Sequence, residues 1–89
     1  MKAIVTVVGN DNVGIIAAVC IRLAKHNVNI LDISQTIMQE KFTMIMIVDL
    51  AGATSNFRTL SDDLKALGTE MNLSIRMQRE EIFDAMHSI

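Results

Sequence analysis

One short segment of the chain combines residue types that could bind a charged small molecule. Asp11, Asn12 and Gly14 follow an apolar run and precede a helical pattern. Because Gly14 has no side chain where the chain enters the helix, backbone N–H groups there could approach an anion such as a carboxylate. Asp11 could hold an ammonium group nearby. By spacing alone, the simpler interpretation is that Asp11 and Asn12 cap the helix and that Gly14 relieves crowding.

The other residues that could support catalysis or metal binding stand apart from one another. Cys20 falls within the apolar pattern of the first helix, which indicates a buried thiol. His26 is expected to contact the terminal carbonyls of that helix, and Asp62 and Asp63 are expected on a solvated helix face. The sequence contains no recognisable metal-ligand set and no grouping of nucleophile, base and orienting residue. We therefore expect no cofactor, no metal and no enzymatic activity; Asp11 and His26 are the only conceivable acid–base residues.

The composition limits the class of protein and its partners. Hydrophobic types make up 51% of the 89 residues, which suffices for one packed domain and argues against disorder. With a net charge of −2 and scattered charges, the chain lacks the basic patch of nucleic-acid binders. No apolar run reaches the roughly 18 residues of a spanning helix, and no signal-peptide pattern is visible. The single cysteine fits a reducing compartment, so we expect a cytoplasmic protein without nucleic-acid or membrane partners.

The periodicity of apolar residues predicts the element order β-α-β-β-α-β. Strands are expected over residues 2–8, 28–39, 42–50 and 71–79, and helices over 13–26 and from Ser55 or Thr54 to Gly68. A bulge near Leu31 and Asp32 would account for the irregular alternation of the second strand. This order predicts an α+β, ferredoxin-like sandwich, with a four-stranded antiparallel sheet and both helices on one face. The first and third strands should be central.

The first helix has apolar residues on much of its circumference. Its buried face is expected to comprise Ile16, Ala17, Cys20, Ile21, Leu23 and Ala24. Ile15 and Val19 would then lie toward the edge of the apolar arc.

The sheet face that the helices leave open should carry an apolar patch. Ile45 and Ile47 alternate with the buried methionines of the third strand and therefore point to that face. We divide the chain into a domain over residues 1–79 and a helical tail over residues 80–89. A partner would cover the patch, or the tail would do so with Ile82, Phe83 and Met86.

The stretch GNDNVGIIAAVCIRLAKHNVNILDISQ resembles the opening of an ACT domain. That family shows a strand, a short Asx/Gly turn, a glycine entering the helix, and an Asn–Ile pair opening the second strand. The matching residues here are Asp11, Gly14, Asn29 and Ile30. The resemblance extends over nearly the whole chain, since the second half supplies the remaining βαβ in order. The C-terminal EIFDAMHSI is similar to the tail of small free-standing ACT proteins.

ACT domains are regulatory modules that commonly bind amino acids and pair through their sheets. The resemblance implies a ligand site between the first loop and helix start of one chain and the second strand of a partner. The implied ligand-binding residues are Asp11, Asn12, Gly14 and Ile15, with Asn29, Ile30 and Asp32 across the interface. We therefore expect an allosteric homodimer that senses an amino acid or a similar small metabolite by a shift in population.

A second hypothesis remains open. The chain could be a protein-interaction module without a small ligand, which recognises a larger metabolic enzyme or regulator. Its dimer edge, exposed sheet face or tail would then form the binding surface.

Overall fold

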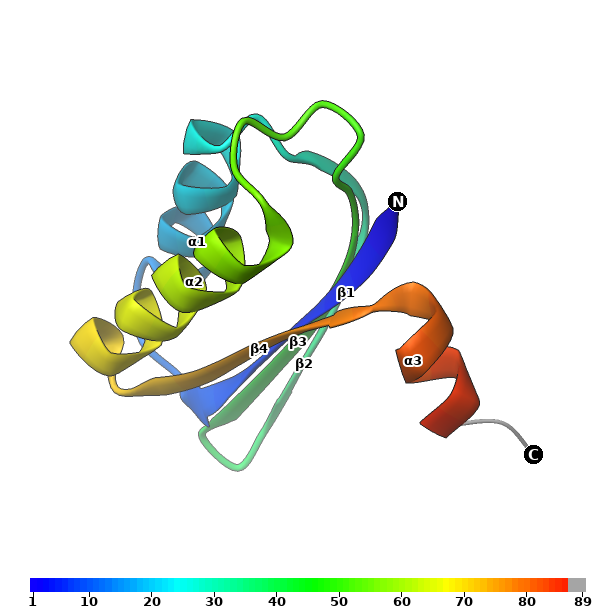
Figure 1. The fold of residues 1–89 in the computed structure, drawn as a ribbon. Coiled ribbons are helices and arrows are strands. Elements are labelled where there is room, and N and C mark those ends of the chain that lie inside the picture. Colours follow the sequence, from blue (N-terminus) through cyan, green and yellow to red (C-terminus); the bar gives the residue numbers. More distant parts are fainter. Residues whose placement is uncertain (87–89) are drawn as a thin grey trace.

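The structure, a computed structural model, describes residues 1–86 and consists of one sheet with helices on both sides (Figure 1). The strands are β1 (Lys2–Asn10), β2 (Asn29–Met38), β3 (Lys41–Asp49) and β4 (Leu73–Arg79). The helices are α1 (Ile15–Lys25), α2 (Phe57–Met71) and α3 (Glu80–Met86). Helices α1 and α2 cover one face, and α3 lies on the opposite face. The predicted ferredoxin-like fold with a helical tail is confirmed.

The sheet is antiparallel throughout and has the order β2-β3-β1-β4, which places β1 and β3 in the centre as predicted. Val7 of β1 pairs with Met44 on one side and with Ile75 on the other, and all three are buried beneath the helices. Aliphatic and methionine side chains fill most of this core, and Phe42 is its only fully buried aromatic residue among those described. The alternation of β3 correctly predicts which of its side chains point inward.

A bulge interrupts β2 where the sequence predicts one. Ile30 pairs with Val48 and Asp32 pairs with Ile47, so Leu31 is the extra residue. Because one residue is inserted, Ile30 and Ile33 both point to the helix side despite their spacing of three. The bulge thus sets the face on which the rest of β2 presents its side chains.

The predicted limits of the second helix are wrong at both ends. Asn56 caps α2, and its side-chain oxygen accepts a hydrogen bond from the N–H of Thr59 at 2.8 Å; neither Ser55 nor Thr54 does so. The helix also continues through Gly68 and ends at Asn72, which adopts a left-handed conformation with φ of 58°. Gly68 serves close packing instead, since a Cβ there would lie 2.6 Å from the carbonyl oxygen of Leu73.

The predicted buried face of the first helix is also largely wrong. Ile15, Val19 and Leu23 form the buried stripe, whereas Ile16 and Ile21 are exposed. The spacing i, i+4, i+8 is as compatible with a helical stripe as the predicted set, because apolar residues occur all round this helix. The sheet, rather than the periodicity, selects which stripe is buried.

The tail lies on the sheet face that the other helices leave open. Helix α3 packs against β1 and β4 (Figure 1), and Ile4 of β1, whose side chain points to this face, is only 5% exposed. Toward β3 the face remains uncovered, and Ile45 is 38% exposed. Residues 87–89 of the predicted tail lie outside the described residues. Within residues 1–86, no helix combines the length and apolar character needed to cross a membrane.

Candidate functional site

A cavity of about 180 Å³ opens between the start of α1 and the helix-facing side of β2. Four of the predicted ligand residues line it, namely Asp11, Asn12, Gly14 and Ile15. The other lining residues are Ile16, Ala17, Gln35, Ile37 and Phe42, which were not predicted as site residues. Strand β2 contributes to the cavity wall because Ile37 pairs with buried Phe42 of β3, and both side chains point to the helix side of the sheet. This contribution depends on the register of β2, which the sequence does not specify precisely.

The start of α1 is built to leave backbone donors free. Gly14 adopts φ of 87°, and within residues 1–86 no side chain caps the helix. The first hydrogen bond of the helix runs from the N–H of Ala18 to the carbonyl oxygen of Gly14 at 2.9 Å. The N–H groups of Ile15, Ile16 and Ala17 therefore lack helical acceptors, and all three residues line the cavity. The helix dipole adds partial positive charge at this position.

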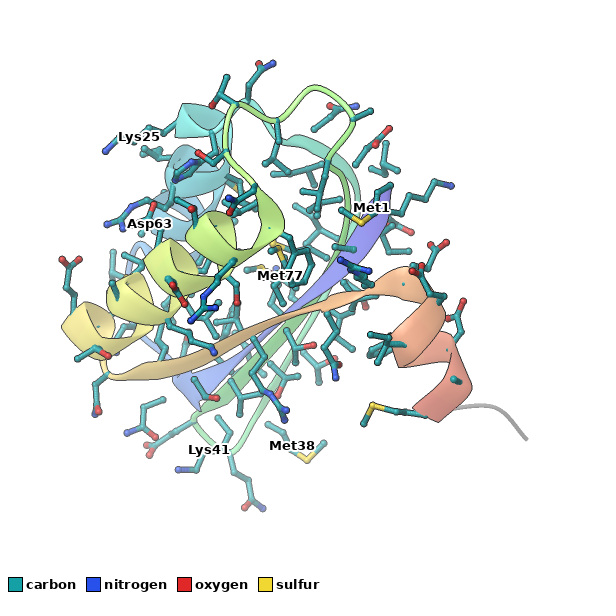
Figure 2. The ribbon with its side chains drawn as sticks, viewed as in Figure 1. Met1, Lys25, Met38, Lys41, Asp63 and Met77 are labelled. Carbon is teal, nitrogen blue, oxygen red and sulfur yellow. The ribbon has the colours of Figure 1, made fainter. Side chains whose placement is uncertain are left out.

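The loop before α1 is tied to the hairpin between β2 and β3. The N–H of Asp11 donates to the carbonyl oxygen of Glu40 at 2.9 Å, and Nζ of Lys41 donates to Oδ1 of Asn10 at 3.0 Å. Met38 and Lys41 mark this end of the molecule in Figure 2, far from Lys25 at the other end of α1. The Asp11 carboxylate is exposed, and within the described residues it forms no ion pair.

The remaining predicted ligand residues lie at the opposite end of β2. Asn29 lines a separate, more polar cavity of about 410 Å³, Ile30 packs against the core, and Oδ1 of Asp32 accepts a hydrogen bond from the N–H of Ile33. A strand rises about 3.3 Å per residue, so along β2 Asn29 lies roughly 26 Å and Asp32 roughly 17 Å from Ile37 of the cavity. One chain therefore does not bring its predicted residues together into one site.

Strand β2 is an open edge with apolar side chains. Ile33 and Ile37 point to the helix side, yet they are 40% and 57% exposed. Gln39 and Glu40 form a two-residue turn with φ of 49° and 70°, flanked by the pair Met38 and Lys41. In such hairpins the flanking pair is hydrogen-bonded, so the backbone groups of residues 33, 35 and 37 point away from β3. This edge can accept a further strand.

A polar cluster joins α1 to α2 on the side away from the cavity. Asp63 accepts from Nη1 of Arg22 at 2.6 Å, and its other oxygen lies 2.6 Å from Nε2 of His26. Nδ1 of His26 lies 2.8 Å from Oγ of Ser55. Figure 2 shows Asp63 on the side of α2 that faces α1. The predictions of a solvated Asp63 and of a His26 that contacts helix carbonyls are therefore wrong.

This cluster alters the acidity of Asp63. The hydrogen bond with the His26 ring is the largest influence and holds the pKa of Asp63 below the ordinary 3.8; Arg22 acts in the same direction, while partial burial opposes both. With a proton on Nε2, His26 donates to Asp63 and accepts from the Ser55 hydroxyl. The order of serine, histidine and aspartate resembles a catalytic arrangement, but none of the cavities described above includes these residues. The cluster acts as a clamp between two helices.

A metal site would need a group of His, Cys, Asp or Glu side chains close together. Within residues 1–86, no three His, Cys, Asp or Glu side chains gather into such a group. The free thiol of Cys20 is half-buried against the core.

Comparison with known proteins gives matches over nearly the whole chain. A family model described as ACT domain matches residues 2–78. A UPF0237 protein from Bifidobacterium longum is 57% identical over 88 residues, covering 99% of this chain and 98% of the relative. An ACT domain protein from Streptococcus pneumoniae is 42% identical with a TM-score of 0.82, covering 94% of each chain. The ACT domain from GTP pyrophosphokinase of Chlorobium tepidum shares the fold at 18% identity, with a TM-score of 0.61 over 88% of this chain and 85% of that one.

Proposed function

The chain belongs to the ACT domain family, in its UPF0237 group, and on that premise we propose that it is an allosteric sensor of an amino acid. The ACT domain is a regulatory ligand-binding module, and the cavity at the start of α1 is where we place its ligand. The observation that carries this proposal is the uncapped start of α1, where residues 15–17 lack helical acceptors for their N–H groups and line a largely apolar cavity beside Asp11.

The lining of the cavity favours a zwitterion with an apolar side chain. The N–H groups of residues 15–17 would donate to the ligand carboxylate, as helix N-termini do for anions. The carboxylate of Asp11 would accept from the ligand ammonium group. Ile37 and Phe42 would contact the side chain of the ligand, since they form the apolar wall opposite the helix start. We therefore favour valine, leucine, isoleucine or methionine over polar amino acids.

A second copy of the chain would complete the site. A volume of about 180 Å³ is below the roughly 300–1,000 Å³ of most small-molecule pockets, which supports a site that a second chain enlarges. If two β2 strands paired antiparallel about a twofold axis, the Asn29 end of each would lie beside the Met38 end of the other. Ile30 of the second copy would then lie on the same face of the sheet as the cavity, and Asn29 and Asp32 would flank it on the opposite face. The eight-stranded sheet would hold two equivalent sites, and ligand binding would favour one dimer geometry.

The proposal assigns the protein no catalytic role and a cytoplasmic location. The single cysteine, which fits a reducing compartment, supports the location. The polar cluster at Asp63 supports the absence of a catalytic role, because its side chains bind one another and do not line a cavity.

The test is a thermal-unfolding screen against the twenty amino acids, with titration calorimetry of each hit. A ligand at 100 times its Kd adds about 2.7 kcal/mol to the free energy of unfolding. In a domain of this size each kcal/mol raises Tm by about 4–8 °C, so binders stand out. The variant Asp11→Asn should weaken binding, whereas Asp62→Asn, an exposed aspartate on α2, should not. Equal affinity of both variants would place the ligand elsewhere.

A flat screen would favour the second candidate function, a protein-interaction module. The exposed apolar side chains along the β2 edge support this alternative, because such edges bind additional strands. In that case a larger enzyme or regulator would co-purify in fixed stoichiometry with the protein, and loss of the edge would abolish co-purification.

A further inference from the structure

A further cavity lies on the other face of the sheet, beside α3. Its volume is about 350 Å³, which falls within the roughly 300–1,000 Å³ of small-molecule pockets. Its lining residues are Thr6, Ile45, Arg76, Gln78, Phe83 and Met86. None of them belongs to the proposed amino acid site. The sheet therefore separates two cavities of different chemistry.

Three neighbouring strands supply the floor of this cavity. Thr6 of β1 pairs with Ile45 of β3 on one side and with Arg76 of β4 on the other. A hydroxyl, an aliphatic chain and a guanidinium group therefore stand in one row across the sheet. Gln78 follows Arg76 by two residues on β4 and points to the same face. The floor thus offers polar groups toward β4 and an apolar surface toward β3.

Helix α3 supplies the wall. Phe83 and Met86 are three residues apart and share one side of the helix. Nε2 of Gln78 lies 3.5 Å from Sδ of Met86, which links the floor to the wall at one end. The cavity exists because α3 covers β1 and β4 but stops short of β3, where Ile45 stays exposed.

The charge of the cavity restricts the ligand. Arg76 brings the only charged side chain of the lining, and within residues 1–86 it forms no ion pair. The carboxylates of α3, at Glu80, Glu81 and Asp84, are not part of the lining. A single guanidinium group matches one carboxylate but not a diphosphate, and a cation would find no acidic partner. The polar groups gather toward β4, and the apolar surface of Ile45, Phe83 and Met86 suits an apolar chain or ring better than a sugar.

We propose that this cavity binds a small monocarboxylate with an apolar chain or ring. Arg76 pairs with the carboxylate through two parallel N–H donors. Thr6 and Gln78 contribute neutral hydrogen bonds to the same group. Ile45 and Met86 contact the apolar part of the ligand, which lies between β3 and α3. The protein then carries a second ligand site, independent of the amino acid site on the opposite face.

The test uses octanoate as the probe and octanol as its uncharged counterpart, in titrations followed by ¹H–¹⁵N spectra of the full chain. Octanoate should shift the backbone amides of Thr6, Ile45 and Gln78 and leave those of residues 11–17 in place. Arg76→Gln should weaken octanoate binding about fivefold, because Arg76 is exposed to solvent. Arg58→Gln, a change at an exposed arginine on α2, should leave the affinity unchanged.

A second variant separates the apolar contact from the charge. Ile45→Thr should weaken octanoate and octanol alike, whereas Arg76→Gln should affect octanoate only. The proposal is overturned if octanoate shifts residues 11–17 instead, if octanol binds as tightly as octanoate, or if Arg76→Gln and Arg58→Gln bind equally well. Absence of any shift at low millimolar octanoate overturns it as well.

Discussion

The backbone N–H of Asp11 donates to the carbonyl oxygen of Glu40 at 2.9 Å, which fixes the loop before α1 against the hairpin of β2 and β3. This hydrogen bond places the cavity at the Met38 end of β2, whereas Asn29 occupies the other end. The two halves of the predicted site can therefore meet only between two chains. Ligand binding and dimer formation should accordingly depend on each other.

Gly14→Val should impair both folding and ligand binding. No atom outside the neighbouring residues lies within 4 Å of a Cβ at this position, so the cost comes from φ of 87° rather than from a clash. A left-handed conformation costs an L-residue about 1–2 kcal/mol, and a β-branched one is affected most. Thermal unfolding should show the lower Tm. Calorimetry with an amino acid that binds the parent should show an affinity lowered about tenfold, since the side chain screens the N–H groups.

Gly14→Asn is the matched control for this variant. Asparagine tolerates the left-handed region, so most of the stability should return. If Gly14→Val folds and binds the amino acid as well as the parent does, the site lies elsewhere.

Ile33→Lys should dissociate the proposed dimer. Ile33 points to the helix side of the β2 edge, and two copies would bring like charges together there. Ile21→Lys adds the same charge on the exposed side of α1, where Ile21 is 69% exposed. Sedimentation over a range of concentrations should show a dimer for the parent and for Ile21→Lys, and a monomer for Ile33→Lys. A monomeric parent at all concentrations would exclude the proposed site between chains.

Asp63→Asn should reduce stability and its dependence on acid pH. The parent carboxylate has a lowered pKa in the folded state, so its contribution is present above the ordinary 3.8 and is lost as pH falls through the folded-state value. The variant should lose about 1 kcal/mol at neutral pH. Its urea midpoint should also fall less steeply below pH 4 than that of the parent. Asp62→Asn, whose carboxylate is exposed one residue away, should retain the parental profile; if it also flattens the profile, the clamp is not the cause.

Gly68→Ala should destabilise the protein although alanine favours helix. The propensity gain in a helix interior is about 1 kcal/mol. Against it stands a Cβ placed 2.6 Å from the backbone carbonyl oxygen of Leu73, which cannot move without disturbing β4. Overpacking of this kind typically costs about 1–3 kcal/mol, so the net effect should be a lower urea midpoint. Gly52→Ala, where the nearest atom is a side-chain nitrogen of Asn27 at 3.3 Å, is the milder comparison; a rise in stability for Gly68→Ala would refute the packing argument.

The sequence by itself determined the order of elements, the strand pairing and the bulge. Strict alternation in β3 and β4 fixes which side chains point inward, because a slip by one residue would expose the whole apolar set. Short connections and right-handed crossovers then allow little besides this sheet order. The family resemblance in residues 9–35 located the loop that lines the cavity.

Only the tertiary structure decided which stripe of α1 is buried, what Gly68 is for, and where His26 and Asp63 point. Apolar residues occupy more than one side of helix α1, so contact with the sheet decides that Ile15 and Val19 are buried rather than Ile16. From the local sequence, Gly68 is predicted to end the helix. Its actual role, close packing against β4, depends on a contact that forms only when the chain folds. Asp63 lies 37 residues from His26 in sequence and 2.6 Å away in space. Such pairings depend on helix packing, which periodicity does not encode.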